Sequence, residues 1–323
     1  MEKKKYPAGL DIRVLVPIIS LSLSLILHIL LPANKNYTQK EFAYYTGFLI
    51  LMLVIYTVVM IITIFHKSFR KKMAHKSWFI GVAFLLLNLY NLATIKFMLI
   101  PSIYFPSPEI IFRVFIKDGA FLLKCLGYSG KLLVTGYLSG CILGILTGIL
   151  VGWSTSWNYW INPVIKVIGP IPSTAWVPIA LVAFPTSFTA SVFLIGLAVW
   201  FPTTVLTSSG ISGVKQAYFE VSSTLGASTI QNIFKIAVPS AMPSIFIGIF
   251  NGTCASFLTL MTAEMLGVKY GLGWYINWQK DMLSYPNVYA GLITIAVTFS
   301  LLITLLFRAR DKILVWQKGV IKW

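Results

Sequence analysis

Charge is scarce in this chain. Charged side chains make up 11% of its 323 residues, and only nine residues are Asp or Glu. Soluble domains carry about a quarter charged residues, so this composition excludes an ordinary soluble domain. Hydrophobic residues account for 57% of the sequence, and the mean hydropathy is +0.82. This balance is typical of an all-α protein that crosses a membrane several times.

Residues that bind metals or carry out catalysis are also few. The three cysteines and three histidines lie far apart and have no metal-ligand spacing, so we predict no metal site. They are Cys125, Cys141, Cys254, His28, His66 and His75. The glycine-rich stretch Gly127–Lys131 lacks the spacing of a phosphate-binding loop and is followed by Leu132. We therefore predict that the chain has no catalytic residues and binds no ATP itself.

Long apolar runs, by contrast, are abundant. A helix needs about 20 apolar residues to cross the hydrocarbon core of a bilayer. Eight runs meet or approach this length: Val14–Leu31, Tyr44–Phe65, Trp78–Ile100, Leu132–Val151, Ile161–Phe184, Phe188–Thr207, Ser240–Thr262 and Val288–Phe307. The fifth run contains four prolines, so we expect that span to be kinked or partly re-entrant. The stretch between the third and fourth runs, Pro101–Gly127, is predicted to form an amphipathic helix on the outer membrane surface.

The basic residues predict how the spans are oriented. With the N-terminus inside, Lys and Arg on the cytoplasmic side outnumber those on the outer side, and the cluster His66–Lys76 is strongly basic. We therefore predict a multi-pass protein of the cell membrane with both termini in the cytoplasm. The excess of positive charge is then explained by the orientation of the spans in the membrane and by contact with membrane lipid. It does not indicate nucleic acid as a partner.

The cytoplasmic stretch Val214–Pro243 is unusually polar for this chain. Apolar residues at three- and four-residue steps predict a first helix that ends at Gly226, because glycine enters the left-handed conformation at helix ends without steric cost. Ser228 and Gln231 have the spacing of a capping box, which predicts a second short helix. Pro239 and Pro243 close the polar stretch where the next apolar run begins. Two short helices at a glycine elbow beside a membrane would form a docking surface.

The same stretch carries a family resemblance. Glu220, two small or apolar residues, Gly226 and then Ile236-x-Val238-Pro239 resemble the cytoplasmic loop signature of binding-protein-dependent ABC importer permeases. Every spacing is kept, and the departures at Val221, Ser222 and Val238 preserve small or apolar character. The stretches Gly169–Pro178, Ala263–Gly267 and Gly271–Gly273 resemble the nitrate/sulfonate/taurine branch. The likeness runs from about Phe105 to the C-terminus.

The resemblance implies a type I ABC importer transmembrane subunit. Its core would have six helices, so we expect residues 1–77 to be an N-terminal extension with two transmembrane helices and residues 78–323 to be the transmembrane domain. The loop 214–239, here called the coupling loop, would dock a pair of cytoplasmic ATPase subunits that hold ATP and Mg²⁺. The docking residues would be Lys215, Glu220, Val221, Ser222, Gly226, Ala227, Ile236 and Pro239.

Further partners follow from the same resemblance. A second, identical permease copy and an extracytoplasmic solute-binding protein are expected, and the solute would be a sulfonate, nitrate, taurine or similar small molecule. Two alternatives remain open. An ion-coupled secondary transporter would need a coupling-ion site, expected as paired acids or discontinuous helices. A non-transport membrane scaffold would have no need for the coupling loop.

Polar residues inside the apolar runs are candidates for a translocation path: Ser173, Thr174, Trp176, Thr203, Thr204, Thr259 and Glu264. Hydroxyls also bond commonly to carbonyls of their own helix, and Glu264 lies at a helix end where a carboxylate can reach water. In the fourth run, glycines recur every four residues: Gly136, Gly140, Gly144, Gly148 and Gly152. They predict close approach of another helix, either in ordinary packing or as a moving or subunit-contacting seam.

Overall fold

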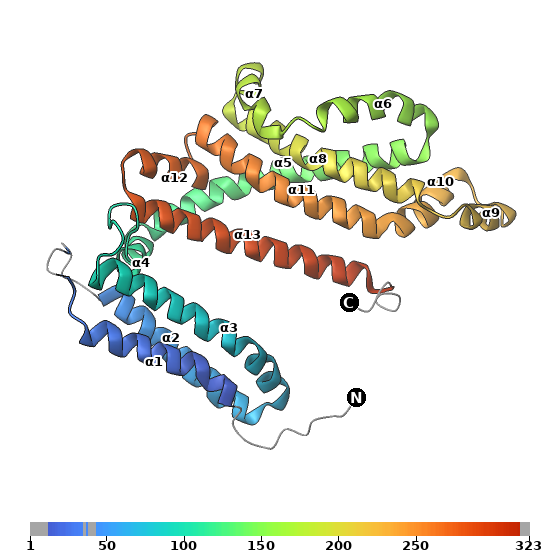
Figure 1. Cartoon of the computed structure of the whole chain (residues 1–323). Coiled ribbons are helices and arrows are strands. Elements are labelled where there is room, and N and C mark those ends of the chain that lie inside the picture. The colour runs from blue at the N-terminus through green and yellow to red at the C-terminus, as the bar shows by residue number, and fades with distance from the viewer. Residues whose placement is uncertain (1–11, 35–36, 38–42, 317–323) are drawn as a thin grey trace. The chain divides into compact units, whose positions relative to one another are not determined.

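The computed structural model describes residues 12–34, 37 and 43–316, and these residues form helices without strands (Figure 1). The longer helices are α1 (Val16–Leu30), α2 (Ala43–Phe65), α3 (Lys67–Asn91), α4 (Pro108–Lys117), α5 (Gly119–Trp153), α6 (Thr155–Ile168), α8 (Ser187–Ser212), α9 (Gln216–Thr224), α11 (Val238–Gly267), α12 (Leu272–Asp281) and α13 (Tyr285–Ile313). The shorter ones are η1 (Ile12–Leu15), η2 (Leu92–Lys96), η3 (Ser173–Trp176), α7 (Val177–Ala183), α10 (Thr229–Gln231) and η4 (Asn232–Ala237). The all-α prediction is confirmed.

The number of possible membrane spans agrees with the sequence. In the described part of the chain, seven helices are long and apolar enough to cross a membrane, and up to eight if a bent pair counts as one span. The bent pair is Thr155–Ile168 with Ser173–Ala183, which meet at 83° across a break that contains Pro170 and Pro172. Proline removes a backbone donor and disfavours helix at the residue before it, which explains the break. The predicted kink in the fifth span is therefore present.

The chain divides into two compact units. The N-terminal unit comprises Met1–Gly119 with Met282–Ala290, and the core unit comprises Ala120–Asp281 with Gly291–Trp323. Helix α3 packs on α1 and α2 inside the N-terminal unit, although the sequence division assigns this span to the transmembrane domain. The sequence-based division into an extension (residues 1–77) and a transmembrane domain (residues 78–323) is a different division from that into compact units, and it stays a prediction.

Polar contacts join the helices of the N-terminal unit. The Ser20 hydroxyl of α1 donates to the Gly81 carbonyl of α3 at 2.8 Å, and the Lys96 ammonium donates to the His28 carbonyl at the end of α1 at 2.8 Å. The carboxylate of Glu109, 1% exposed, accepts the backbone N–H groups of Tyr44 and Tyr45 at 2.9 and 2.7 Å. The bonds made by Lys96 and Glu109 satisfy backbone groups at helix ends that have no partner within their own helix.

Helix α4 differs in part from the predicted interfacial helix. It spans only Pro108–Lys117 and packs against α2, where Ile111 and Val114 are buried. Leu122, which the sequence assigns to the same amphipathic helix, lies in α5. The chain ends one helix at Lys117 and starts the next at Gly119, so the periodic pattern runs through two helices. The prediction of a single helix over this stretch is wrong.

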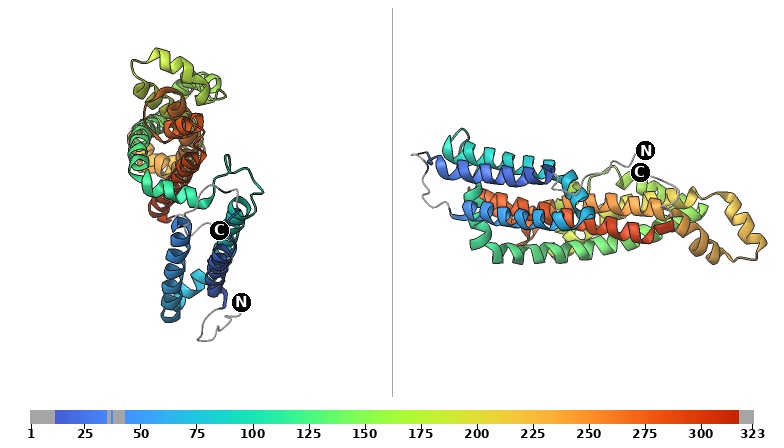
Figure 2. Two further views of the ribbon diagram at one scale, coloured as in Figure 1. Left: turned by 90° about the vertical axis from the view of Figure 1, so that its left-hand side faces the viewer. Right: turned by 90° about the horizontal axis from the view of Figure 1, so that it is seen from below.

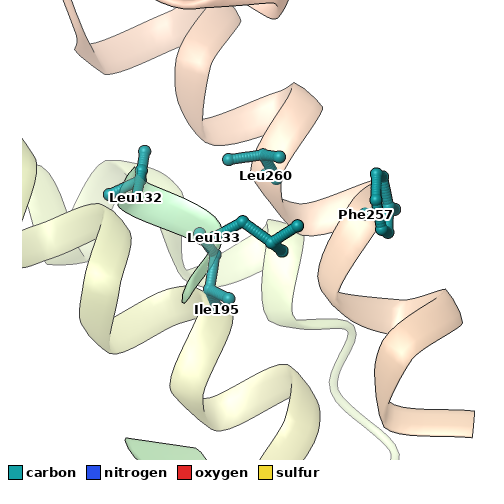
Figure 3. Close-up of a cluster of buried hydrophobic side chains, with 5 residues drawn as sticks. All are labelled: Leu132, Leu133, Ile195, Phe257 and Leu260. Carbon is teal, nitrogen blue, oxygen red and sulfur yellow. The ribbon is translucent and has the colours of Figure 1, made fainter. Parts of the chain in front are cut away.

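The core unit is built around α5, α8 and α11. Five buried side chains from these three helices form one cluster: Leu132, Leu133, Ile195, Phe257 and Leu260 (Figure 3). Phe299 of α13 packs against this cluster, with its ring 4.3 Å from that of Phe257 between centroids. The three helices therefore meet in a shared apolar cluster.

The glycine stripe of α5 faces α8 of the same chain. A Cβ atom at Gly140 would lie 2.5 Å from the Gly196 carbonyl oxygen, and one at Gly148 would lie 2.5 Å from Thr207 Cβ. Gly136, Gly144 and Gly152 have equally close neighbours on α8. Only hydrogen fits at these positions, so the five glycines let two helix backbones approach closely.

This close contact predicts a specific sensitivity. We expect Gly140→Ala to lower the free energy of unfolding by about 1–3 kcal/mol, because the methyl group must displace the α8 backbone. The measurement is the Tm of the purified protein in detergent. Gly127→Ala is the matched control, since Gly127 lies in the same helix and a Cβ atom there would have no neighbour within 4 Å. Alanine there should leave Tm unchanged or raise it. Equal losses in both variants would contradict the close α5–α8 contact.

Candidate functional site

The first helix of the coupling loop, α9, ends in a left-handed turn. Gly226 has φ +76°, and its N–H donates to the Ser223 carbonyl at 3.0 Å. The Ala227 N–H donates to the Ser222 carbonyl at 3.0 Å. Together these two bonds form a Schellman motif, which satisfies the last carbonyls of a helix when a residue such as glycine adopts positive φ. The predicted elbow is present at Gly226.

The second half of the loop starts as the sequence predicts and ends differently. Ser228 and Gln231 form the expected capping box, in which the Ser228 N–H donates to Gln231 Oε1 at 2.9 Å. The prediction of a separate second short helix is wrong, because one helical run continues from Thr229 to Gly267. The π-helical turn η4 directly precedes Pro239. Its wider backbone gives the proline ring room beside the preceding carbonyls.

A side-chain bond locks the two halves together. The Ser222 hydroxyl donates to Asn232 Oδ1 at 2.7 Å, and both residues are 8% exposed. A buried hydrogen bond of this kind is costly to break because its partners would be left unsatisfied. Ser222, which departs from the alanine usual in the family signature, therefore fixes the angle of the elbow.

The outer face of the coupling loop is apolar. Leu225 is 82% exposed, Ile230 69% and Phe234 62%, and Tyr218 and Val221 are exposed as well. Glu220 and Lys215 are exposed beside them, whereas Ala227, Ile236 and Pro239 are half-buried. The loop lies at one end of the core unit, beyond the ends of its long helices (Figure 2). Exposed apolar side chains grouped in this way are typical of surfaces that contact another protein or a membrane.

A cavity of about 350 Å³ lies elsewhere in the core unit. Its polar lining is Ser173 and Thr174 of η3, with Asn251 and Thr259 of α11, and the Ser173 and Thr259 hydroxyls lie 2.6 Å apart. Asn251, Ala255, Leu258 and Thr259 follow helical spacing, so one face of α11 forms a wall. The break after α6 also borders the cavity, where Gly169 allows the Phe201 ring to approach closely.

The remaining path candidates lie outside this cavity. Thr203 and Thr204 are fully buried at the α5–α8 contact, where the Thr204 hydroxyl lies 2.8 Å from that of Thr147. Trp176 packs against a cluster that includes Val177 and Ala263. The cavity therefore brings together three of the residues proposed from sequence: Ser173, Thr174 and Thr259. Asn251 was missed, although it is a rare amide within a long apolar run.

Glu264 has a structural partner that sequence reasoning did not identify. The residue is 1% exposed, so its carboxylate does not reach water, and Oε2 accepts the Gly273 N–H at 2.7 Å. The neighbouring Leu272 N–H donates to the Ser129 hydroxyl at 2.8 Å. Both donors belong to the first turn of α12. A Cβ atom at Gly271 would lie 2.4 Å from Glu264 Oε1, so the glycine pair Gly271 and Gly273 makes room for the carboxylate.

The family comparison covers both the coupling loop and the cavity. A family model described as binding-protein-dependent transport system inner membrane component matches residues 140–314, more than half of the chain. The chain belongs to this family. It is a multi-pass membrane protein and the permease subunit of an ABC importer, a class that works with a separate ATPase and a substrate-binding protein.

Individual relatives agree with this family. An ABC transporter permease protein of Methanocaldococcus jannaschii is 29% identical over 230 residues, which cover 67% of this chain and 86% of the relative. An aliphatic sulfonates transport permease protein of Bacillus subtilis is 31% identical over 217 residues, covering 66% and 78%. The inward-facing MetNI methionine ABC transporter has a similar fold, with a TM-score of 0.51 and 15% identity over 61% of this chain and 98% of that chain.

The capping role of Glu264 in this permease predicts a local effect. We expect Glu264→Leu to speed hydrogen exchange in the first turn of α12, because the buried Gly273 N–H loses its acceptor and about 1–3 kcal/mol of stabilisation. Hydrogen exchange with mass spectrometry of peptides covering residues 268–281 measures the change. Glu264→Gln is the control, since its side-chain carbonyl keeps an acceptor of the same reach. Equal exchange in all three proteins would show that Glu264 does not hold this turn.

Proposed function

We propose that this permease works as a homodimer that imports a small sulfonate, nitrate, taurine or similar solute, driven by a pair of ATPase subunits. In this proposal both termini lie in the cytoplasm, and the ATPase subunits, rather than this chain, hold ATP and Mg²⁺. The sulfonate assignment is supported by the relative from Bacillus subtilis. The observation that carries the proposal is the exposed apolar face of the coupling loop.

The coupling loop and the cavity are connected mechanically. The helical run Thr229–Gly267 begins in the coupling loop and includes the α11 face that lines the cavity through Asn251 and Thr259. A displacement of the elbow can therefore be transmitted along one continuous helical run to a wall of the cavity. When ATP draws the two ATPase subunits together, each coupling loop follows, and the dimer changes from inward- to outward-facing.

The energy required for this change is modest. Moving a two-state equilibrium from 1:99 to 99:1 takes about 5.5 kcal/mol of differential binding. An apolar docking face can transmit such a bias only if the two halves of the coupling loop keep their relative angle when the ATPase subunits move. The Schellman turn at Gly226 and the Ser222–Asn232 bond supply that rigidity.

The proposal predicts that the docking face and the elbow are both needed to retain the ATPase. We expect Leu225→Asp to reduce co-purification of the cognate ATPase at least tenfold, because it places a charge where Leu225 is 82% exposed. Gly226→Val should act similarly by opening the elbow, since a β-branched residue at φ +76° is strained by about 1–2 kcal/mol.

Gly226→Asn is the matched control, because asparagine tolerates the left-handed conformation. It should retain the ATPase and its solute-stimulated hydrolysis. Leu225→Asp and Gly226→Asn should keep a Tm close to that of the unchanged protein, since Leu225 is exposed and a Cβ atom at Gly226 would have no neighbour within 4 Å. Gly226→Val should lower the Tm by only the few degrees that its backbone strain implies. Full ATPase retention by both Leu225→Asp and Gly226→Val would overturn the proposed docking surface.

A further inference from the structure

A second hollow lies between α11 and α13, near the end of the core unit that carries the coupling loop. It has a volume of about 230 Å³ and is lined by five apolar side chains and one arginine. They are Phe246, Ile247 and Phe250 of α11 with Leu306, Phe307 and Arg310 of α13. We call it the α11–α13 groove. None of these residues lines the cavity described above.

Aromatic contacts shape the groove and position its arginine. The rings of Phe250 and Phe307 stack with centroids 5.2 Å apart. The Arg310 guanidinium lies 4.7 Å above the Phe307 ring, and its Nε and Nη2 donate to Asp311 Oδ1 at 3.0 and 2.8 Å. Arg310 is half-buried, so its aliphatic stem packs along apolar side chains while its charged head stays near the surface.

The groove lies where an apolar span meets a basic end. Arg308 and Lys312 are exposed on either side of Arg310, and Asp311 is the acidic residue beside them. Toward the middle of the span α13 exposes further apolar residues, Leu305, Leu301 and Val297, on a different face of the helix from Arg310. A shallow hollow on α13, lined by Ala296, Val297, Ser300, Leu301 and Thr304, lies along the same stretch. From Arg310 back to Val297 the helix covers about 20 Å.

These features match one kind of molecule. A glycerophospholipid has an acyl chain that spans half of a hydrocarbon core of about 30 Å, and an anionic headgroup at the interface. We propose that the α11–α13 groove binds one anionic phospholipid, with its phosphate at Arg310 and an acyl chain against the apolar lining formed by Ile247, Phe250 and Phe307. The charge of the basic end selects an anionic headgroup, and the aromatic walls fix the position of the chain.

The test is native mass spectrometry of the purified permease in detergent, with phosphatidylglycerol or phosphatidylcholine of identical acyl chains as the probe. One phosphatidylglycerol should be retained per chain, and phosphatidylcholine should bind about fivefold more weakly, as expected for one basic residue near a lipid surface. Arg310→Gln should remove this preference. Arg308→Gln is the matched control, with the same loss of charge outside the groove, and should keep it.

Two further variants separate charge from shape. Asp311→Asn should strengthen phosphatidylglycerol binding, because it removes the carboxylate that competes for Arg310. Ile247→Trp should weaken the binding of both lipids by filling the groove, and Ile247 is 53% exposed, so the larger ring does not disturb the core.

Three results would overturn the proposal. Equal losses from Arg310→Gln and Arg308→Gln would reveal a diffuse basic belt and no defined site. Retention of both lipids without preference would show that the headgroup is not recognised. Dissociation of a dimer by Ile247→Trp, without a change in retained lipid, would assign the groove to the contact between two permease copies.

Discussion

One uninterrupted helical run, Thr229–Gly267, connects the parts of this permease that its function requires. At one end it carries half of the coupling loop, in the middle it forms a wall of the cavity, and at the other end it holds Glu264 under α12. A break in this run would separate the docking surface from the cavity. The π-helical turn before Pro239 keeps the run intact across a residue that otherwise ends or kinks helices.

A buried carboxylate in each of the two units accepts backbone N–H groups at the start of a helix. Glu109 accepts the first N–H groups of α2, and Glu264 accepts an N–H in the first turn of α12. Helix starts leave N–H groups without partners in their own helix, and an apolar surrounding offers no water to replace them. Both acids are therefore buried where a carboxyl oxygen accepts from the first turn of another helix.

Much of this architecture could be predicted from local sequence. The kinked span follows from its prolines, and the elbow at Gly226 and the capping box at Ser228 follow from residue types with strict backbone preferences. Partners distant in sequence could not be predicted. Nothing local shows that α8 meets the glycine stripe, that Ser222 bonds to Asn232, or that Gly271 accommodates Glu264. The continuation past Pro239 was missed because a π-helical turn has no sequence signature.

The central claim is that force enters the bundle through the coupling loop on the cytoplasmic side. Labelling of single cysteines with a membrane-impermeant maleimide in intact and permeabilised cells tests it most directly, with the native cysteines replaced. Cysteine at Glu220, in the loop, should react only after permeabilisation, and cysteine at Lys280, exposed at the end of α12, should react in intact cells. Labelling of the Glu220 position in intact cells would contradict the account.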